Sequence, residues 1–369
     1  MIDFQLNEEQ TMIRDLVGAF ARDEIRPAAR QADENAQIPP ALIEKVWELG
    51  LVRGAIPESY GGDGGERSAV TGAVVAEELG YGDLAVGVHA LAPRLFAYPI
   101  LAMGTDRQKE KYLRQFTAPK FAAATAAVME PKWDFDLTEL STTARRDGAG
   151  FVISGTKCVV PLAAESDAIL VYAKSGAGNG FAAVDAFIVA RDNPGLKIGA
   201  REQNMGLKGL ASYEVILDNC KVAGDARIGA DKGIDFSRLM SEARVGFAAM
   251  AIGVMRAASD YARDYARERK AFGVPIATKQ AIAFMLADMA IEIDAARLLV
   301  WEAASKLDKG HDALKESYLA KNYVAASALK VTDNAVQVLG GHGYIREHPV
   351  EMWLRNARAV AALDGIATV

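Results

Sequence analysis

Cysteine and histidine are scarce in this chain, and the usual metal-binding spacings are missing. The two cysteines, Cys158 and Cys220, are too few for a disulfide framework, and neither belongs to a CxxC pair. The four histidines form no HExxH motif. Protein zinc sites need three or four such ligands at defined spacings. We therefore expect no metal cofactor.

Blocks of like charge and long apolar runs are missing too. Lys and Arg number 42 against 48 Asp and Glu, a net charge of −6 without a basic patch, which makes nucleic acid an unexpected partner. No run of 18 uncharged apolar residues occurs, so we expect no membrane span. The opening MIDFQLNEEQ is polar and acidic, unlike a secretory signal. These features predict a cytoplasmic protein.

What is present is a chain of 369 residues, 51% of them hydrophobic, which is enough for a large core. Residues 1–119 read as helix. Met12, Ile13, Leu16 and Val17 recur at helical spacing, and Pro27 is expected to end that first helix. The glycine-rich loop PESYGGDGG lacks the GxGxxG fingerprint and follows no strand, so it does not predict a Rossmann phosphate site.

Between residues 120 and 229 the hydrophobic period changes. The runs FVISGT, AILVYAK, DAFIVAR and SYEVILDNCKV are rich in β-branched and aromatic residues, and the turn signals SGAGNG and RDNPG separate them. This pattern predicts a compact antiparallel β domain.

Residues 230–369 return to helical spacing. Ile282, Met285, Met289 and Ile293 step by three or four along one face, and segments 236–269, 278–309 and 312–339 are long enough for bundle helices. We therefore predict an α+β fold with an N-terminal α-helical domain, a middle antiparallel β domain and a C-terminal four-helix bundle.

Several segments resemble the acyl-CoA dehydrogenases. They are LNEEQTMIRDLVGAFARDEIRPAA and GLVRGAIPESYGGDGG near the start, and YARDYARERKAFGVPIATKQAIAFMLADMAIEIDAARLL and QVLGGHGYIREHPVEMWLRNAR near the end. The resemblance follows nearly the whole chain in order. It implies FAD as cofactor, an acyl-CoA substrate and a tetrameric assembly. It also implies α,β-desaturation, in which a carboxylate removes the α-proton and the β-hydride passes to the flavin. An electron-transfer flavoprotein or another acceptor is then expected to reoxidise the flavin.

The resemblance also assigns residues that would grip the ADP half of a neighbouring subunit's FAD. An arginine suits the pyrophosphate because its guanidinium offers forked donors. Glycines permit close backbone approach to a cofactor. The matching positions are Arg269, Phe272, Gln280, Gln337, Gly340 and Gly341.

The positions that would bind a subunit's own flavin ring depart from the family pattern. The segment usually written TEPxAGSD reads MEPKWDFD here, so Met129 replaces the flavin-binding hydroxyl. Further on, the family's Trp-Ile-Thr becomes Val159, Val160 and Pro161, and proline also lacks a backbone N–H. Because the losses fall on one side, the chain resembles one subunit type of heteromeric acyl-CoA dehydrogenases.

The catalytic base is expected near the end of the chain. The family's Tyr-Glu-Gly-Thr segment aligns with LDGI, which puts Asp364 at the base position, one methylene shorter than glutamate and followed by Ile366. A loop carboxylate without chemistry is the alternative. Some relatives carry the base on another helix, where Glu242 lies one residue away from the matching position. Arg244 matches a helix residue beside the substrate, or else belongs to a buried ion pair.

Three functions remain open at this point. The chain is an acyl-CoA dehydrogenase subunit, active by itself or only with a second acyl-CoA dehydrogenase subunit. Alternatively, it is a non-catalytic structural or regulatory partner of such a subunit. The third function is processing of an acyl-carrier-protein thioester.

Overall fold

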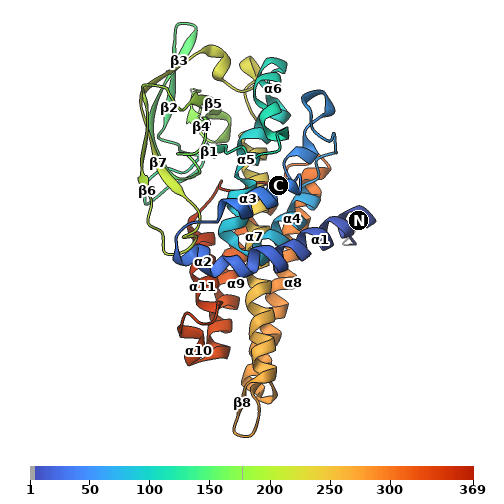
Figure 1. Cartoon of the computed structure of the whole chain (residues 1–369). Helices are drawn as coiled ribbons and strands as arrows, with labels where there is room; N and C mark the ends of the chain where they lie inside the picture. The colour runs from blue at the N-terminus through green and yellow to red at the C-terminus, as the bar shows by residue number, and fades with distance from the viewer. Residues whose placement is uncertain (1–4, 177) are drawn as a thin grey trace.

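The computed structural model describes residues 5–176 and 178–369, and it arranges them as helices, a sheet and a helical bundle (Figure 1). The N-terminal helices are α1 (Glu8–Phe20), α2 (Arg26–Glu34), α3 (Pro40–Glu48), α4 (Ala69–Gly82), α5 (Leu84–Met103) and α6 (Asp106–Tyr112). The C-terminal helices are α7 (Phe236–Glu268), α8 (Gln280–Asp308), α9 (Leu314–Leu339), α10 (Gly341–Tyr344) and α11 (Val350–Ala362). The predicted three-part α+β fold is confirmed.

The first helix begins with a capping box, and the helical segment does not end at Pro27 as the sequence predicted. Asn7 accepts a hydrogen bond from the Gln10 backbone N–H, and the Gln10 side chain accepts one from Asn7 in return. A π-helical segment, Ala21–Ile25, then joins α1 directly to α2. Pro27 is tolerated because it stands in the first turn of α2, just after this wider π turn, where a proline ring meets less obstruction. The expectation that Pro27 ends the helix is therefore wrong.

The middle sheet is mixed, not purely antiparallel. Its strands are β1 (Thr125–Ala127), β2 (Thr143–Asp147), β3 (Gly150–Pro161), β4 (Ala168–Lys174), β5 (Val184–Ala190), β6 (Leu196–Arg201) and β7 (Ser212–Val222). The order is β1-β4-β2-β3-β7-β6, with β5 paired to β4. The β1–β4 and β2–β4 pairs are parallel and the others antiparallel. Strand direction depends on how the chain returns to the sheet, which alternation of side chains does not encode.

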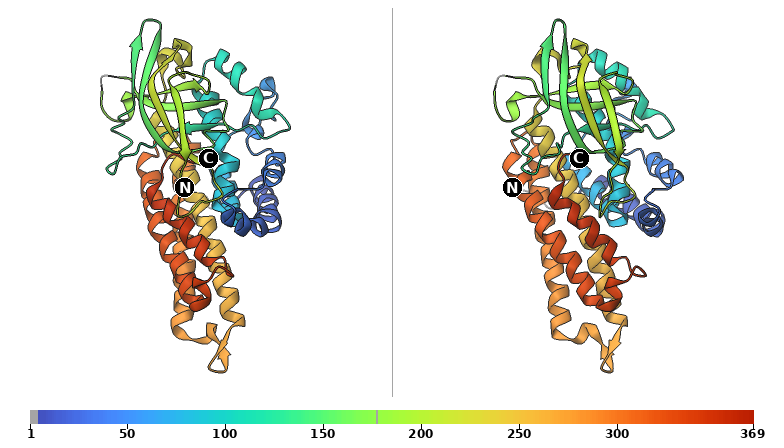
Figure 2. Two further views of the ribbon diagram at one scale, coloured as in Figure 1. Left: turned by 60° about the vertical axis from the view of Figure 1, so that its left-hand side comes forward. Right: turned by 90° about the vertical axis from the view of Figure 1, so that its left-hand side faces the viewer.

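Helices α7, α8, α9 and α11 pack together as the C-terminal bundle, which extends away from the sheet (Figures 1 and 2). A short hairpin, β8 (Lys270–Ala271) and β9 (Val274–Pro275), connects α7 to α8 at the far end of the bundle. The observed limits of α7, α8 and α9 lie within two residues of those predicted. The domain limits 1–119, 120–229 and 230–369 stay predictions.

Buried ion pairs tie the N-terminal helices to the bundle. Glu77 of α4 pairs with Arg256 of α7 at 2.9 Å and with Arg297 of α8 at 2.9 Å. Glu78 pairs with the same Arg256 at 2.7 Å. Burial raises the pKa of Glu78, although the Arg256 charge opposes this. Removing one partner from such a set leaves a buried charge uncompensated, so the set fixes how the helices meet.

Helix α5 is long and apolar enough to cross a membrane by length and composition alone. However, 89% of its most hydrophobic stretch is buried inside the protein, packed between α4, α7 and the sheet. This burial is typical of the central helix of a large core.

Candidate active site and cofactor surface

Asp364 lies just beyond α11 and pairs with Arg244 of α7. The Asp364 Oδ2 atom is 3.1 Å from Arg244 Nε, and both side chains are largely buried. Gly365, at φ +69°, turns its N–H toward Asp364 Oδ1 at 3.0 Å. A left-handed residue at this turn favours glycine. The structure thus joins two positions that sequence comparison had assigned separately to base and substrate-side arginine.

A second cation, Lys321 of α9, lies close enough to feel this pair. Burial lowers the pKa of Lys321, while the Asp364 charge raises it and the Arg244 charge lowers it. Arg244 also stacks over the Tyr318 ring, with its Cζ 5.2 Å from the ring centroid. Sequence reasoning missed Lys321, although a lysine on the buried face of a predicted helix was a usable signal.

The backbone of Asp364 contacts the segment that would carry the flavin-ring hydroxyl. The Asp364 N–H lies 3.4 Å from the Met129 sulfur. A cavity lined by Gly365, Glu242 and Ala243 beside this contact measures only about 10 Å³. That is room for roughly one water molecule, whereas small-molecule sites typically span about 300–1,000 Å³. Side chains therefore fill this part of the interior.

The residues after Asp364 are buried between α4 and α7. A Cβ atom added at Gly72 would lie 2.7 Å from the Val369 Cβ, and one at Gly246 would lie 2.8 Å from the Thr368 carbonyl carbon. Two helix glycines thus allow the extended segment to pass close to both helix backbones. This packing fixes the position of Asp364.

Glu242, the weaker base candidate, is buried and doubly paired. It accepts hydrogen bonds from Arg67 and, at 3.0 Å, from Arg238 Nε. Both of its oxygens are therefore occupied by guanidinium groups. In this arrangement the buried Glu242 carboxylate is neutralised by two partly exposed arginines.

The other flavin-ring positions also present apolar or constrained groups. Val159 adopts φ 51°, an unfavourable region for a β-branched residue, and its N–H donates to Glu202 Oε1 at 3.0 Å. Pro161 pairs with Ser212 in the β3–β7 ladder. Trp133 replaces a small residue and is 97% exposed. No hydroxyl stands at Met129 or Pro161, the two positions where the resemblance implies one, so the ring side fits a flavin poorly.

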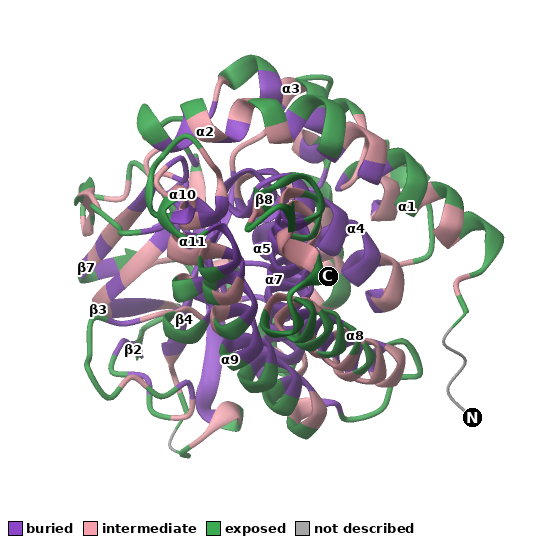
Figure 3. Ribbon diagram, turned by 90° about the horizontal axis from the view of Figure 1, so that it is seen from below, coloured by how far each residue is buried: buried purple, intermediate pink, exposed green. Residues whose placement is uncertain are grey.

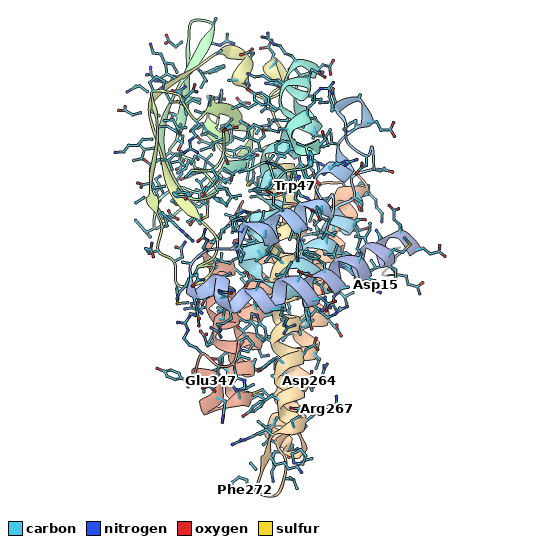
Figure 4. All side chains as sticks on the ribbon, in the orientation of Figure 1. Asp15, Trp47, Asp264, Arg267, Phe272 and Glu347 are labelled. Atoms are coloured by element: carbon cyan, nitrogen blue, oxygen red, sulfur yellow. The ribbon has the colours of Figure 1, made fainter. Side chains whose placement is uncertain are left out.

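The positions assigned to the ADP half of FAD lie elsewhere, at the far end of the bundle. Arg269 is the exposed C-cap residue that follows α7, and Phe272 occupies the β8–β9 turn with 96% of its surface exposed. Figure 4 shows Phe272 at the tip, pointing away from the body of the protein. Gln280 begins α8 nearby and is exposed as well. These three side chains are presented outward.

The glycine turn after α9 also lies at the far end of the bundle. Gln337 is exposed in the last turn of α9, and Gly340 ends that helix at φ 58°. A Cβ atom added at Gly340 or Gly341 would meet nothing within 4 Å. Figure 1 shows α10 and the β8 hairpin at this end, far from the C-terminus of the chain. The ADP-side positions fit an external group, and they are well separated from the chain's own Asp364.

The comparisons with known proteins agree with this architecture. The N-terminal, middle and C-terminal domains of acyl-CoA dehydrogenases match residues 7–120, 125–220 and 233–369. The chain belongs to the acyl-CoA dehydrogenase family. FAD is the cofactor that this membership indicates, and a solved relative of the same fold contains it.

Three relatives illustrate the range of the family. A 3-(aryl)acrylate reductase of Clostridium sporogenes is 36% identical, over 98% of this chain and 96% of its own. The CarC subunit of the caffeyl-CoA reductase-Etf complex of Acetobacterium woodii is 35% identical, over 98% and 96%. The solved butyryl-CoA dehydrogenase of Megasphaera elsdenii is 29% identical with a TM-score of 0.88, and covers 97% of this chain and 95% of its own.

Proposed function

We propose that this chain is one subunit of a heteromeric acyl-CoA dehydrogenase that desaturates an acyl-CoA thioester at its α and β carbons. FAD, when bound, accepts the β-hydride in this chemistry. The chain's contribution is the ADP-side surface, formed by Arg269, Phe272, Gln280 and the Gly340–Gly341 turn. A second acyl-CoA dehydrogenase subunit completes the site with the flavin-ring contacts.

One observation carries this proposal: the ADP-side half of the expected FAD site is open to an external group, whereas the flavin-ring half is packed and lacks hydroxyls. The ADP-side positions are exposed with open space around them. The ring-side position Met129 is packed against Asp364 and offers no hydroxyl. A homo-oligomer needs both halves in working order, because each chain then binds its own flavin ring and the ADP half of a neighbour's FAD. A subunit that serves a neighbour's FAD needs only the first.

An exposed apolar stripe supports an assembly. Phe284, Ile291 and Leu298 recur every seven residues on α8 and are 61%, 65% and 45% exposed. Figure 3 shows exposed residues along the outward side of α8. Large exposed apolar patches typically mark protein interfaces. We propose a tetramer through this face, with homo- and heteromeric forms as the alternatives, and an electron-transfer flavoprotein as the electron acceptor.

A non-catalytic partner role is the second candidate, and the Asp364 environment favours it. A base must be free to take a proton in the reacting complex. Asp364 is instead paired with Arg244, and the adjoining cavity holds about 10 Å³. On this alternative the chain stabilises a catalytic subunit and lends it FAD contacts, while Asp364 serves only in the ion pair.

Purification alone and together with a second acyl-CoA dehydrogenase subunit from the neighbouring genes tests the proposal. Flavin absorbance per chain measures cofactor content, and turnover of an acyl-CoA panel with an artificial acceptor measures activity. We expect the lone chain to hold far less than one FAD per subunit and the complex to hold FAD and turn over. Stoichiometric FAD on the lone chain would overturn the heteromeric assignment.

A further inference from the structure

The loop between β1 and β2 presents a tryptophan to solvent. Trp133 has 97% of its surface exposed, the largest fraction among the large hydrophobic side chains that the structure describes. Its neighbours Pro131, Lys132 and Asp134 are exposed as well. Tryptophan is highly buried on average in folded proteins and is enriched at protein interfaces. The core of this chain does not use the Trp133 side chain, so only a second molecule would bury it.

Both ends of this loop are fixed to the protein. At one end, the Glu130 carboxylate accepts a hydrogen bond from the Ser141 backbone N–H at 2.7 Å and pairs with Lys157 at 3.1 Å, and both side chains of this pair are buried. At the other end, Asp136 Oδ1 accepts hydrogen bonds from the backbone N–H and the hydroxyl of Thr138, at 2.7 and 2.8 Å. The loop therefore presents its tryptophan from a supported position.

The loop belongs to residues 129–136, the segment that would bind this chain's own flavin ring and that we call the ring-side segment. Trp133 follows Met129 by four residues, and the Met129 sulfur lies 3.4 Å from the Asp364 N–H. The bundle tip, here the β8–β9 hairpin, lies at the opposite end of the molecule from the sheet (Figure 1). The chain's own bundle tip therefore does not reach its own ring-side segment.

A second bundle tip reaches this segment in the heteromeric assembly, so the contact rests on the proposed function. In that assembly, the bundle tip of this chain contacts the FAD held at the partner's ring-side segment. Two subunits of one fold that pair about a two-fold axis exchange equivalent contacts in both directions. The partner's bundle tip then faces the ring-side segment of this chain, where Trp133 is exposed.

The bundle tip of this chain indicates what such a tip offers to a tryptophan. Phe272 has 96% of its surface exposed, and Arg269 and Lys270 beside it are exposed cations. An indole ring attracts a guanidinium or ammonium group over its face, and it packs edge-on against a phenyl ring. Asp134, next to Trp133, adds a charge of the opposite sign. The exposed loop is thus complementary to a tip of this kind.

We propose that Trp133 docks the bundle tip of the second acyl-CoA dehydrogenase subunit, in the junction where a complete site would hold FAD. Met129 and Pro161 offer no hydroxyl to a flavin at this junction, and the tryptophan supplies an apolar contact instead. The heteromer then has two unlike junctions. At one, the tip of this chain contacts the partner's FAD, and at the other, the partner's tip contacts Trp133.

Acrylamide quenching of tryptophan fluorescence tests this contact in the intact protein, alone and in complex with the second subunit. The chain has four tryptophans, and the difference between wild type and Trp133→Phe isolates the signal of Trp133. We expect acrylamide to quench this signal readily in the lone chain and severalfold less in the complex, because the partner's tip covers the indole ring.

The outcomes separate this contact from the proposed function. A complex that holds FAD and turns over while Trp133 stays equally quenchable would overturn the contact and leave the proposed function standing. Protection of Trp133 in the lone chain would assign the contact to a second copy of this chain and overturn the choice of partner. Failure of the two subunits to associate would overturn both.

Variants at the same position measure the strength of the contact. Trp133→Ala should weaken subunit association about 30-fold or more in sedimentation experiments, since truncating a tryptophan at the centre of an interface typically costs that much. Trp133→Phe keeps an aromatic ring and should retain most of the affinity. Circular dichroism should show normal folding, because the side chain is exposed in the lone chain.

Met12→Ala is the matched control. It also removes a large exposed side chain, 70% exposed, but from α1, and it should associate like wild type. Equal affinities of Trp133→Ala and Met12→Ala for the second subunit would remove Trp133 from the interface.

Discussion

Arg244 and Asp364 stand 120 residues apart in the chain, yet Arg244 Nε lies 3.1 Å from Asp364 Oδ2 in the folded protein. The pair links the N-terminal third of α7 to the segment beyond α11. It also decides how the candidate base is held, because the same carboxylate that would take a proton neutralises a buried arginine. The energetic cost of separating the two groups is therefore the first quantity to measure.

A double-mutant cycle measures this coupling. Arg244→Met and Asp364→Asn should each lower the free energy of unfolding by about 2–4 kcal/mol, because each leaves a buried partner unsatisfied. The double variant should lose less than the sum, with a coupling of about 1–3 kcal/mol from urea titrations. Additive losses would show that the pair is not formed.

Asp364→Asn also tests the base. If Asp364 takes the α-proton, turnover by the assembled complex should fall by about 100-fold or more, since that is the usual contribution of a general base. Glu347→Gln, an exposed carboxylate on another loop, is the control. Unchanged turnover in Asp364→Asn would assign the reaction to the partner subunit alone.

Arg269→Gln should weaken FAD binding by the complex about 10- to 100-fold, because it removes charge-assisted hydrogen bonds to phosphate. Folding should be unaffected, since Arg269 is exposed. Arg267→Gln, two residues earlier and also exposed, provides a matched loss of charge. Flavin fluorescence during dialysis follows the release. Equal release from the two variants would remove Arg269 from the cofactor surface.

Met129→Thr combined with Pro161→Thr should increase the FAD retained by the lone chain severalfold. The change restores two hydroxyls on the ring side, each hydrogen bond contributing about 1 kcal/mol. Met205→Thr makes a similar exchange at an exposed methionine and should change nothing. Absorbance at flavin wavelengths after gel filtration gives the ratio. No gain in the double variant would mean that other residues exclude the ring.

We expect the hydrogen-bonded contact of Glu292 between α8 and α9 to weaken at acidic pH. Hydrogen bonds from Lys330, Ser327 and Tyr323 lower the pKa of Glu292 to about 2. A depressed carboxylate pKa stabilises the fold above the unfolded value of about 4.3, and this stability is lost as pH falls toward 2. Glu292→Gln should cost about 1–2 kcal/mol at pH 7.

Denaturant titrations of wild type and Glu292→Gln between pH 7 and pH 2.5 measure this effect. The gap between the two proteins should narrow as the pH falls. Glu302→Gln, on the same helix, is the control for loss of charge on α8. A gap that stays constant with pH would show that the Glu292 carboxylate is not the cause.

The sequence was most informative where structure follows local periodicity. The bundle helices were predicted to within two residues because apolar spacing sets which face of a helix is buried. Arg269 and Phe272 were assigned to the ADP half of FAD from the contiguous segment RKAFG. The roles of all the site residues remain predictions, since their positions in the fold do not test their chemistry.

The sequence failed where the outcome depends on neighbours in space. Pro27 looked like a helix end, but a π turn before it lets the helix continue. Period-two alternation indicated strands, but it did not show that β1 and β4 run parallel. Lys321 and Arg94 stand among apolar helix residues, and the packed structure shows that both are buried charges.

By itself, the sequence determined the three-part architecture, the family resemblance and the uneven loss of flavin-ring hydroxyls. These depend on residue types and spacings along the chain. Only the tertiary structure decided that Asp364 pairs with Arg244 and that Met129 packs against the Asp364 backbone. Charges interact over distances of a few ångströms, and the fold alone determines which charges come that close.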